Sequence, residues 1–192
     1  MKKSIFLCLL LMSFWGCNDS SKNTEQTPTT TADAADKGRA IDAADLALIT
    51  DVVHNFYKYY DVFQQDDKRT INYLNTGGKV AKLDMPKLAN YHAEMMKSGL
   101  ISKAYIDNDM AYLKGLEAEW KKNNENGSDG PLSGFDADRV FCGQDWDIKT
   151  YTTGAIKAET LGANQVKATI EASKIELVKE NDKWLITKIV CE

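Results

Sequence analysis

The fold class follows from residues 155–190, which read AIKAETLGANQVKATIEASKIELVKENDKWLITKIV. Apolar and polar residues alternate in this stretch, as around Val166 and Ile170, and this period of two is typical of half-buried β-strands. The turn sequences at 162–164 and 180–182 favour antiparallel hairpins between neighbouring strands. The pattern predicts four strands, at residues 155–161, 165–172, 175–178 and 183–190.

Upstream of these strands, apolar residues recur at the spacing of helices. A long helix is predicted to begin at about Ile41 or Asp42, and a second is predicted between Asp84 and Gly99. A third helix is predicted to start near Ser102. The first helix carries an aromatic cluster, which indicates core packing but also suits a ligand site: Phe56, Tyr57, Tyr59, Tyr60 and Phe63.

Helices that precede strands along the chain indicate an α+β domain. We expect the N-terminal helices to pack on a curved antiparallel sheet, which curls around the long first helix. We assign residues 41–192 to one domain, because about 150 residues are a usual size for a single hydrophobic core. A polar, Gly-rich loop at 123–134 is predicted between the helices and the strands.

The N-terminal residues 1–17, MKKSIFLCLLLMSFWGC, predict an export signal. Two lysines precede an apolar run that is too short to span a bilayer and has the length found in signal peptides. Gly16 before Cys17 resembles the bacterial lipoprotein signal, which is cleaved before a cysteine that then carries fatty acids such as palmitate. The alternative is an ordinary signal peptide in which Cys17 is incidental. Residues 18–40 are polar and predict a disordered tether.

The remaining cysteines fit an exported protein. Cys142 and Cys191 would form a disulfide bond in an oxidising compartment, and their wide separation matches no zinc-binding spacing. The alternative is a pair of reduced, buried thiols. The formal net charge of −4, without a basic run, argues against nucleic acid as a partner and against electrostatic adhesion to anionic lipid. Membrane attachment would therefore depend on the lipid at Cys17.

Several short motifs carry a resemblance to a family. They are 99-GLIS-102, the segment 135-FDADRVF-141 followed by 144-QD-145, and 180-ENDKWLI-186. With three helices ahead of the sheet, the chain resembles a family of uncharacterised exported bacterial lipoproteins and domains. The order of elements is similar to the cystatin-like cone fold shared with nuclear transport factor two and ketosteroid isomerase. This resemblance implies a cone whose open end can hold a small molecule or a partner, and it implies no particular activity.

Isomerase-like members of that fold use a tyrosine and buried acids, so the resemblance makes some residues candidates for cavity or ligand contact: Tyr57, Tyr60, Gln144, Asp145 and Trp146. Asp145 is equally well explained as a turn carboxylate. His54 and His92 are interpreted as surface or partly exposed residues. The sequence contains no phosphate-binding glycine loop, no nucleophile elbow and no metal-ligand spacing, so we predict neither a metal site nor a cofactor, and we do not predict an enzyme.

The leading hypothesis is a non-catalytic binding module, lipid-anchored in the bacterial cell envelope and facing the periplasm, on either the inner or the outer membrane. Its cone mouth and loop 123–134 would hold an envelope protein or a small ligand. A second hypothesis is an immunity lipoprotein that captures a basic secreted effector with acids gathered in one region: Glu125, Asp129, Asp136, Asp138, Asp145 and Asp147. A small-molecule-binding or isomerase- or hydrolase-like enzyme is a third. Cone folds often pair through the sheet face, so a homodimer is a further hypothesis.

Overall fold

The structure is a computed structural model that describes residues 41–66 and 72–191. These residues belong to one compact unit. The predicted signal at 1–17, with Cys17, and the predicted tether at 18–40 lie outside the described residues.

The first helix, α1 (Ala43–Gln65), supplies much of the core. Asp42 caps its N-terminus by accepting a hydrogen bond from the Asp45 backbone N–H at 2.8 Å, which satisfies one of the amides that a helix end leaves unpaired. One face of the helix is buried, at three- and four-residue steps: Ile49, Val53, Phe56, Tyr57, Tyr60 and Phe63. The predicted apolar stripe is confirmed, and its aromatic residues pack into the domain.

Two further helices follow a small hairpin. Strands β1 (Leu74–Asn75) and β2 (Lys82–Leu83) pair antiparallel. Helix α2 (Met85–Met96) is capped by Asp84, and helix α3 (Lys103–Asn123) is capped by Ser102. Asn124 ends α3 in the left-handed conformation, with φ of 57°. The predicted starts of both helices are confirmed, whereas the hairpin has too few residues to produce a strand pattern.

The C-terminal part of the chain forms a four-stranded antiparallel sheet in the order β3-β4-β5-β6. A short helix, α4 (Ile148–Thr153), precedes the sheet. The strands are β3 (Lys157–Gly162), β4 (Gln165–Ile170), β5 (Ser173–Glu180) and β6 (Lys183–Cys191). The predicted alternation is confirmed in β4, where Val166, Ala168 and Ile170 are buried. Sequence reasoning missed α4 because six residues carry no readable helical period.

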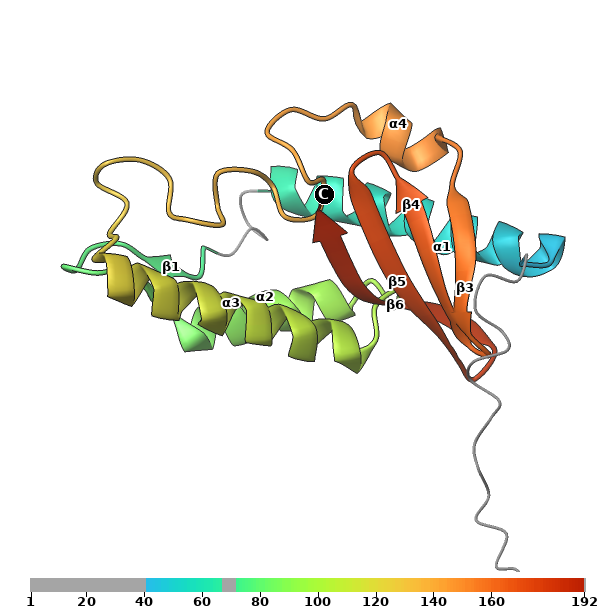
Figure 1. The fold of residues 1–192 in the computed structure, drawn as a ribbon, viewed down its shortest axis with the longest axis horizontal. Coiled ribbons are helices and arrows are strands. Elements are labelled where there is room, and N and C mark those ends of the chain that lie inside the picture. Colours follow the sequence, from blue (N-terminus) through green and yellow to red (C-terminus); the bar gives the residue numbers. More distant parts are fainter. Residues whose placement is uncertain (1–40, 67–71, 192) are drawn as a thin grey trace, which may run out of the picture. The chain divides into compact units, whose positions relative to one another are not determined.

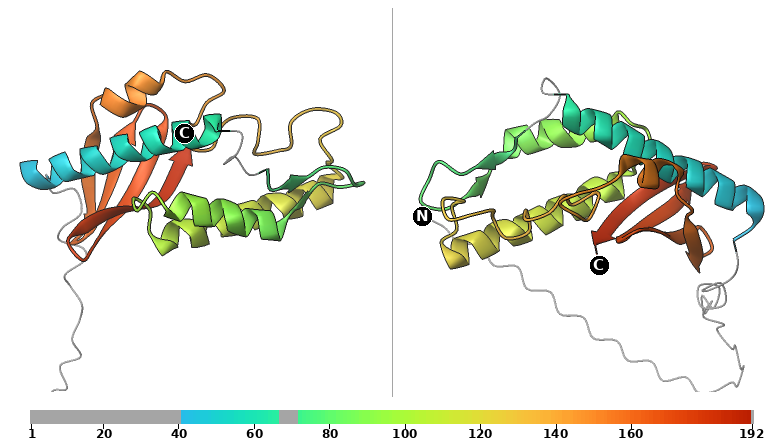
Figure 2. Two further views of the ribbon diagram at one scale, coloured as in Figure 1. Left: turned by 180° about the vertical axis from the view of Figure 1, so that it is seen from behind. Right: turned by 90° about the horizontal axis from the view of Figure 1, so that it is seen from above.

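Helix α1 crosses one face of the sheet, and α3 lies alongside β6 (Figures 1 and 2). Asp45 at the start of α1 accepts hydrogen bonds from the side chains of Lys179 at 2.8 Å and Trp184 at 2.9 Å. The backbone N–H of Ser102, just before α3, donates to the Ile186 carbonyl at 2.9 Å. Helices and antiparallel strands therefore share one core, which confirms the α+β class, while the cone shape stays a prediction.

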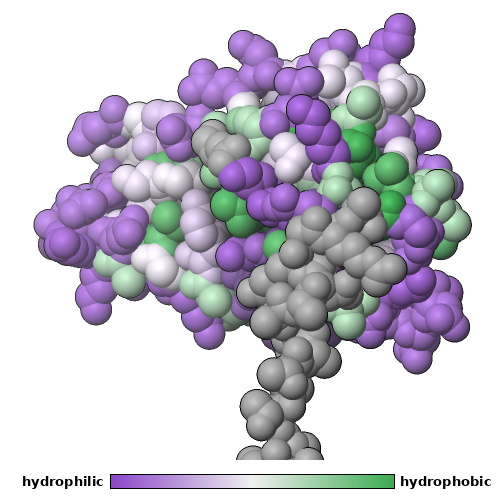
Figure 3. Space-filling model, turned by 45° about the vertical axis from the view of Figure 1, so that its right-hand side comes forward, coloured by the Kyte–Doolittle hydropathy of each residue, from purple (hydrophilic) through white to green (hydrophobic). Residues whose placement is uncertain are grey.

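One face of the described residues is mainly polar (Figure 3). Figure 3 shows hydrophilic side chains over most of one face, with small apolar areas between them. The large apolar side chains that are exposed come from several different elements: Leu48, Val62, Met85, Met96, Tyr112, Trp146 and Val190. Tyr112 and Val190 are of interest because both also line the pocket described next.

Candidate functional site

A pocket of about 630 Å³ lies where the C-terminal end of α1, the helices α2 and α3, the segment 135–140 and the end of β6 meet. This volume is within the usual range for small-molecule sites, about 300–1,000 Å³. Aromatic side chains dominate its wall, with Phe63 from α1, Tyr91 from α2, Tyr105 from α3 and Phe135 from the following loop. Elements from both halves of the domain are therefore needed to form it.

Asp138 fixes the segment 135–140 against α1. Its Oδ1 atom accepts the backbone N–H groups of Val140 at 2.8 Å and Phe141 at 2.7 Å. Its Oδ2 atom accepts the Tyr60 hydroxyl at 3.0 Å and the Gln64 side-chain amide at 2.7 Å. Four donors on one carboxylate leave it little capacity to accept a proton from a ligand, so Asp138 holds the wall in place.

A second carboxylate, Asp109 on α3, lies between His92 and Arg139. Its side chain is 8 % exposed; Oδ2 is 2.8 Å from His92 Nε2, and Oδ1 accepts a hydrogen bond from Arg139 Nη2. Burial alone would raise the pKa of Asp109, but the hydrogen bond from His92 and the charge and hydrogen bond of Arg139 outweigh it and lower that pKa. Asp109 is therefore ionised at neutral pH and compensated by its neighbours.

His92 corrects one prediction. The sequence suggested a partly exposed histidine, whereas its side chain is 6 % exposed and bonded to Asp109. The physical reason is the packing of α2 against α3, which brings a carboxylate within reach of a ring that would otherwise be costly to bury.

Four tyrosines of the pocket are held as neutral phenols by burial: Tyr60, Tyr73, Tyr91 and Tyr105. Burial raises the pKa of Tyr73 to about 12, although the nearby Arg139 opposes the shift. Burial also raises the pKa values of Tyr60, Tyr91 and Tyr105. At neutral pH these side chains can donate hydrogen bonds, and none is prepared to act as a phenolate base.

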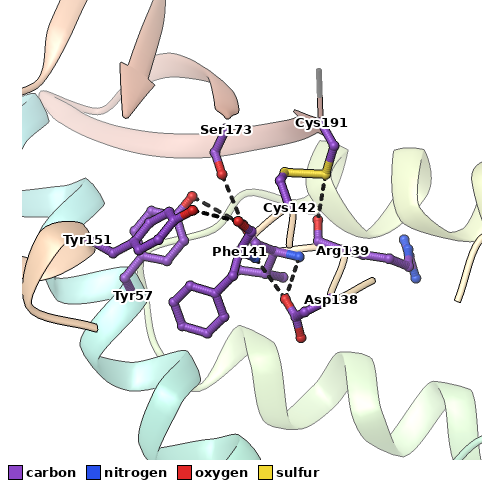
Figure 4. Close-up of a disulfide and its surroundings, with 9 residues drawn as sticks. Tyr57, Asp138, Arg139, Phe141, Cys142, Tyr151, Ser173 and Cys191 are labelled. Carbon is purple, nitrogen blue, oxygen red and sulfur yellow. Dashed lines mark hydrogen bonds between the residues drawn. A yellow bond between two sulfur atoms is a disulfide. The ribbon is translucent and has the colours of Figure 1, made fainter. Parts of the chain in front are cut away.

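A disulfide bond joins Cys142 to Cys191, which is one of the lining residues of the pocket (Figure 4). Cys142 adopts a left-handed conformation, with φ of 57°, directly after Phe141. On one side of this turn, Tyr57 and Ser173 donate to the Val140 carbonyl at 3.2 and 3.3 Å. The Arg139 side chain extends to the other side, away from Tyr57 (Figure 4). The sequence predicted this disulfide. One of its two residues, Cys191, lines the pocket, so the disulfide is part of the scaffold of the pocket wall.

The structure separates the five residues predicted to contact a ligand. Tyr60 lines the pocket, but the other four are not among its lining residues. Tyr57 is buried with its hydroxyl on the Val140 carbonyl, and Trp146 stacks on Phe141 with ring centroids 4.4 Å apart. Gln144 donates to the Asp136 carbonyl at 2.8 Å, and Asp145 is exposed. These four residues support the turn around the disulfide or face solvent.

The six acids suggested for effector capture have different local roles. Asp138 faces inward as described, Asp147 caps α4, and Glu125 accepts hydrogen bonds from the backbone N–H and the hydroxyl of Ser133. Asp136 and Asp145 are exposed. Half of the set is therefore occupied in holding turns and a helix end.

Sequence reasoning missed Asp109 and Arg139 as site residues. Asp109 lies within a polar helical stretch and shows no special spacing. Arg139 is the one arginine among the residues that the structure describes, and it stands inside the aromatic segment 135-FDADRVF-141. A lone arginine among aromatic residues is a usable signal, because a buried guanidinium requires a carboxylate partner.

The described parts of the chain contain no group of three or more His, Cys, Asp or Glu side chains that could hold a metal ion. Within the same residues, no helix has the length and apolar character needed to cross a membrane. Comparison of the chain with protein-family models, curated proteins and solved structures found no match. The fold and the site thus define the molecule as an α+β domain with an aromatic-lined pocket.

Proposed function

We propose that this chain is a non-catalytic binding module that holds a small molecule in the pocket between α1, α3 and the end of β6. The single observation that carries the proposal is the pocket itself, about 630 Å³ with an aromatic wall. Binding sites for small molecules combine such apolar surface with a few oriented polar groups, and here Arg139, Tyr91 and Tyr105 supply them.

Binding is favoured over catalysis by the state of the acidic groups. Asp109 and Asp138 are each engaged by several donors, and the phenols stay protonated because burial raises their pKa values. General acid–base catalysis needs a group that exchanges a proton near the working pH. The lining residues offer fixed donors and rings instead, which suits recognition.

The test is a ligand-observed NMR screen of neutral aromatic fragments against the purified domain. Ala137 lines the pocket, so Ala137→Trp should fill it and abolish the signals, and Val190→Trp at the rim should do the same. The matched control is Ala163→Trp in the exposed turn between β3 and β4. We expect fragments to bind the wild type and the control alike. Fragment binding that survives in folded Ala137→Trp and Val190→Trp variants, or no binding at all, would overturn the proposal.

We further propose that the domain is tethered in the bacterial cell envelope through a lipid at Cys17. The support is the sequence alone: a positive start, a short apolar run and a small residue before the cysteine. Cys17→Ser should move the protein from the membrane fraction to the soluble fraction. Mass spectrometry that finds an unmodified Met1 in the native protein would contradict it.

A further inference from the structure

Two hydroxyl groups in the pocket wall have no hydrogen-bond partner among the residues that the structure describes. Tyr91 is 9 % exposed and Tyr105 is 6 % exposed, both line the pocket, and neither hydroxyl has a hydrogen-bond partner among the described residues. Every fully buried side-chain oxygen and nitrogen in those residues does have a partner. The Tyr91 and Tyr105 hydroxyls must therefore open onto the pocket, where a bound molecule can reach them.

These two hydroxyls can act together as donors. Burial raises the pKa of Tyr91, and the nearby Tyr105 raises it further, as expected if the two phenols are neighbours. Of the other lining phenols, Tyr60 donates to Asp138 and Tyr73 accepts from Arg139 at 3.4 Å, while Tyr112 is exposed. Because the carboxylates Asp109 and Asp138 are occupied, the Tyr91 and Tyr105 hydroxyls are best matched by a ligand that supplies an acceptor.

The charges in the wall balance. Asp109 and Asp138 carry negative charge, and Arg139 and Lys188 carry positive charge. A charged ligand would lose its hydration and face a wall that carries no net opposite charge. An uncharged ligand avoids that loss, so the balance favours one.

Aromatic rings form a large part of the wall, beside aliphatic side chains such as Leu74 and Ile189. Tyr73 lies 5.0 Å from Tyr91 and 6.3 Å from Phe135, measured between ring centroids. The Arg139 guanidinium lies over the rings of Tyr112 and Phe135, at 4.6 and 5.8 Å. Offset and edge-to-face contacts with such rings favour a flat, apolar ligand body.

Resting on the proposed function, we propose that the pocket recognises an uncharged molecule with a flat ring system and a carbonyl-type oxygen, which accepts hydrogen bonds from Tyr91 and Tyr105.

The experiment compares three probes that share one ring system. These are 2-acetylnaphthalene, which carries a neutral acceptor, 2-ethylnaphthalene, which has none, and 2-naphthoate, which is charged. Because a hydrogen bond from a buried hydroxyl is worth about 1–1.5 kcal/mol, we expect calorimetry to show 2-acetylnaphthalene binding about tenfold tighter than 2-ethylnaphthalene. We expect 2-naphthoate to bind more weakly than 2-acetylnaphthalene.

The variants separate hydrogen bonding from ring contact. The double substitution Tyr91→Phe with Tyr105→Phe should remove the preference for 2-acetylnaphthalene and leave the affinity for 2-ethylnaphthalene unchanged. Tyr59→Phe is the matched control, because the Tyr59 hydroxyl donates to the Glu94 carbonyl at 2.6 Å and Tyr59 is not a lining residue. That variant should keep the wild-type preference.

The results also separate this inference from the proposed function. Equal affinity of the wild type for 2-acetylnaphthalene and 2-ethylnaphthalene, or tighter binding of 2-naphthoate, overturns the ligand class while pocket binding stands. A preference that persists in the double variant overturns the role of the two tyrosines. If no probe binds while the fragment screen finds ligands that Ala137→Trp excludes, only this inference fails; if that screen is also empty, both fail.

Discussion

Tyr73 illustrates how burial controls a single side chain in the pocket wall. It is 9 % exposed and contacts Arg139, whose charge would favour a phenolate. Burial outweighs that charge and raises the pKa of Tyr73 from 10.0 to about 12. The hydroxyl therefore stays protonated over most of the alkaline range, at the expense of folding stability at high pH.

Through Tyr73, a rise in pH above about 10 lowers the stability of the fold. The unfolded chain releases the Tyr73 proton near pH 10, and the folded chain holds it to about pH 12, so rising pH favours unfolding across this window. With about 1.4 kcal/mol per pKa unit, Tyr73 should account for roughly 1.4 kcal/mol of lost stability at about pH 11. Urea unfolding should show a smaller fall between about pH 9 and about pH 11 for Tyr73→Phe than for the wild type. Equal falls in the two proteins would contradict this account.

The structural roles of some single residues could be predicted from the sequence, and those of others could not. The caps Asp84 and Ser102 were predictable, because a capping side chain acts on amides three residues away. The pair Asp109 and Arg139 was not, since its members are 30 residues apart and no local pattern joins them. His92 was misjudged for the same reason, as its burial depends on Asp109, 17 residues further along the chain.

Among the elements, two glycines provide a matched test of packing. Gly154 ends α4, and a Cβ atom there would lie 2.3 Å from the Thr150 carbonyl oxygen, which belongs to the backbone and cannot easily move. Gly115 lies inside α3, and a Cβ atom there would meet nothing within 4 Å. One substitution should therefore have opposite effects at the two positions.

Gly154→Ala should lower the free energy of unfolding by about 1–3 kcal/mol, because the backbone must shift to relieve the contact. Gly115→Ala should raise it by about 0.5–1 kcal/mol, the usual difference in helix propensity between alanine and glycine. Urea denaturation of both variants provides the measurement. A stabilised Gly154→Ala variant would show that α4 tolerates the shift, contrary to the expectation.

The sequence predicted those helices and strands in which buried apolar residues recur with a clear period. Helix α1 has six buried residues on one face, and β4 alternates without a break. The hairpin β1–β2, with two residues in each strand, and the six-residue α4 are too short for a period to appear. Their positions depend on tertiary contacts, such as the His54 Nε2 atom at 2.9 Å from the Gly154 carbonyl oxygen.

For the whole domain, the disulfide is the main covalent constraint. Cys142 and Cys191 are 49 residues apart, and on the chain-entropy model closing such a loop is worth about 4 kcal/mol. Replacing both with serine should lower the free energy of unfolding by about 2–4 kcal/mol and weaken ligand binding, because the end of β6 would loosen beside the pocket. Reductant should reproduce both effects in the wild type but not in the variant. A loss below about 1 kcal/mol would mean that packing alone holds this end of the strand.

The α+β class could be predicted for the whole molecule because it follows from the order of periodic segments. The pocket could not, since its wall combines Phe63, Tyr91, Tyr105 and Arg139 from distant parts of the chain. Gln144, Asp145 and Trp146, which the sequence suggested for ligand contact, are not among the lining residues of this pocket.

The contacts of Asp45 have a consequence for how the chain reaches this structure. Its hydrogen-bond partners Lys179 and Trp184 follow it by 134 and 139 residues. Chains that depend on such remote contacts fold slowly, and α1 leaves the ribosome long before the strands that cover it. During that interval its aromatic face is open to chaperones and proteases, so the yield of native protein should depend on how quickly the last two strands follow.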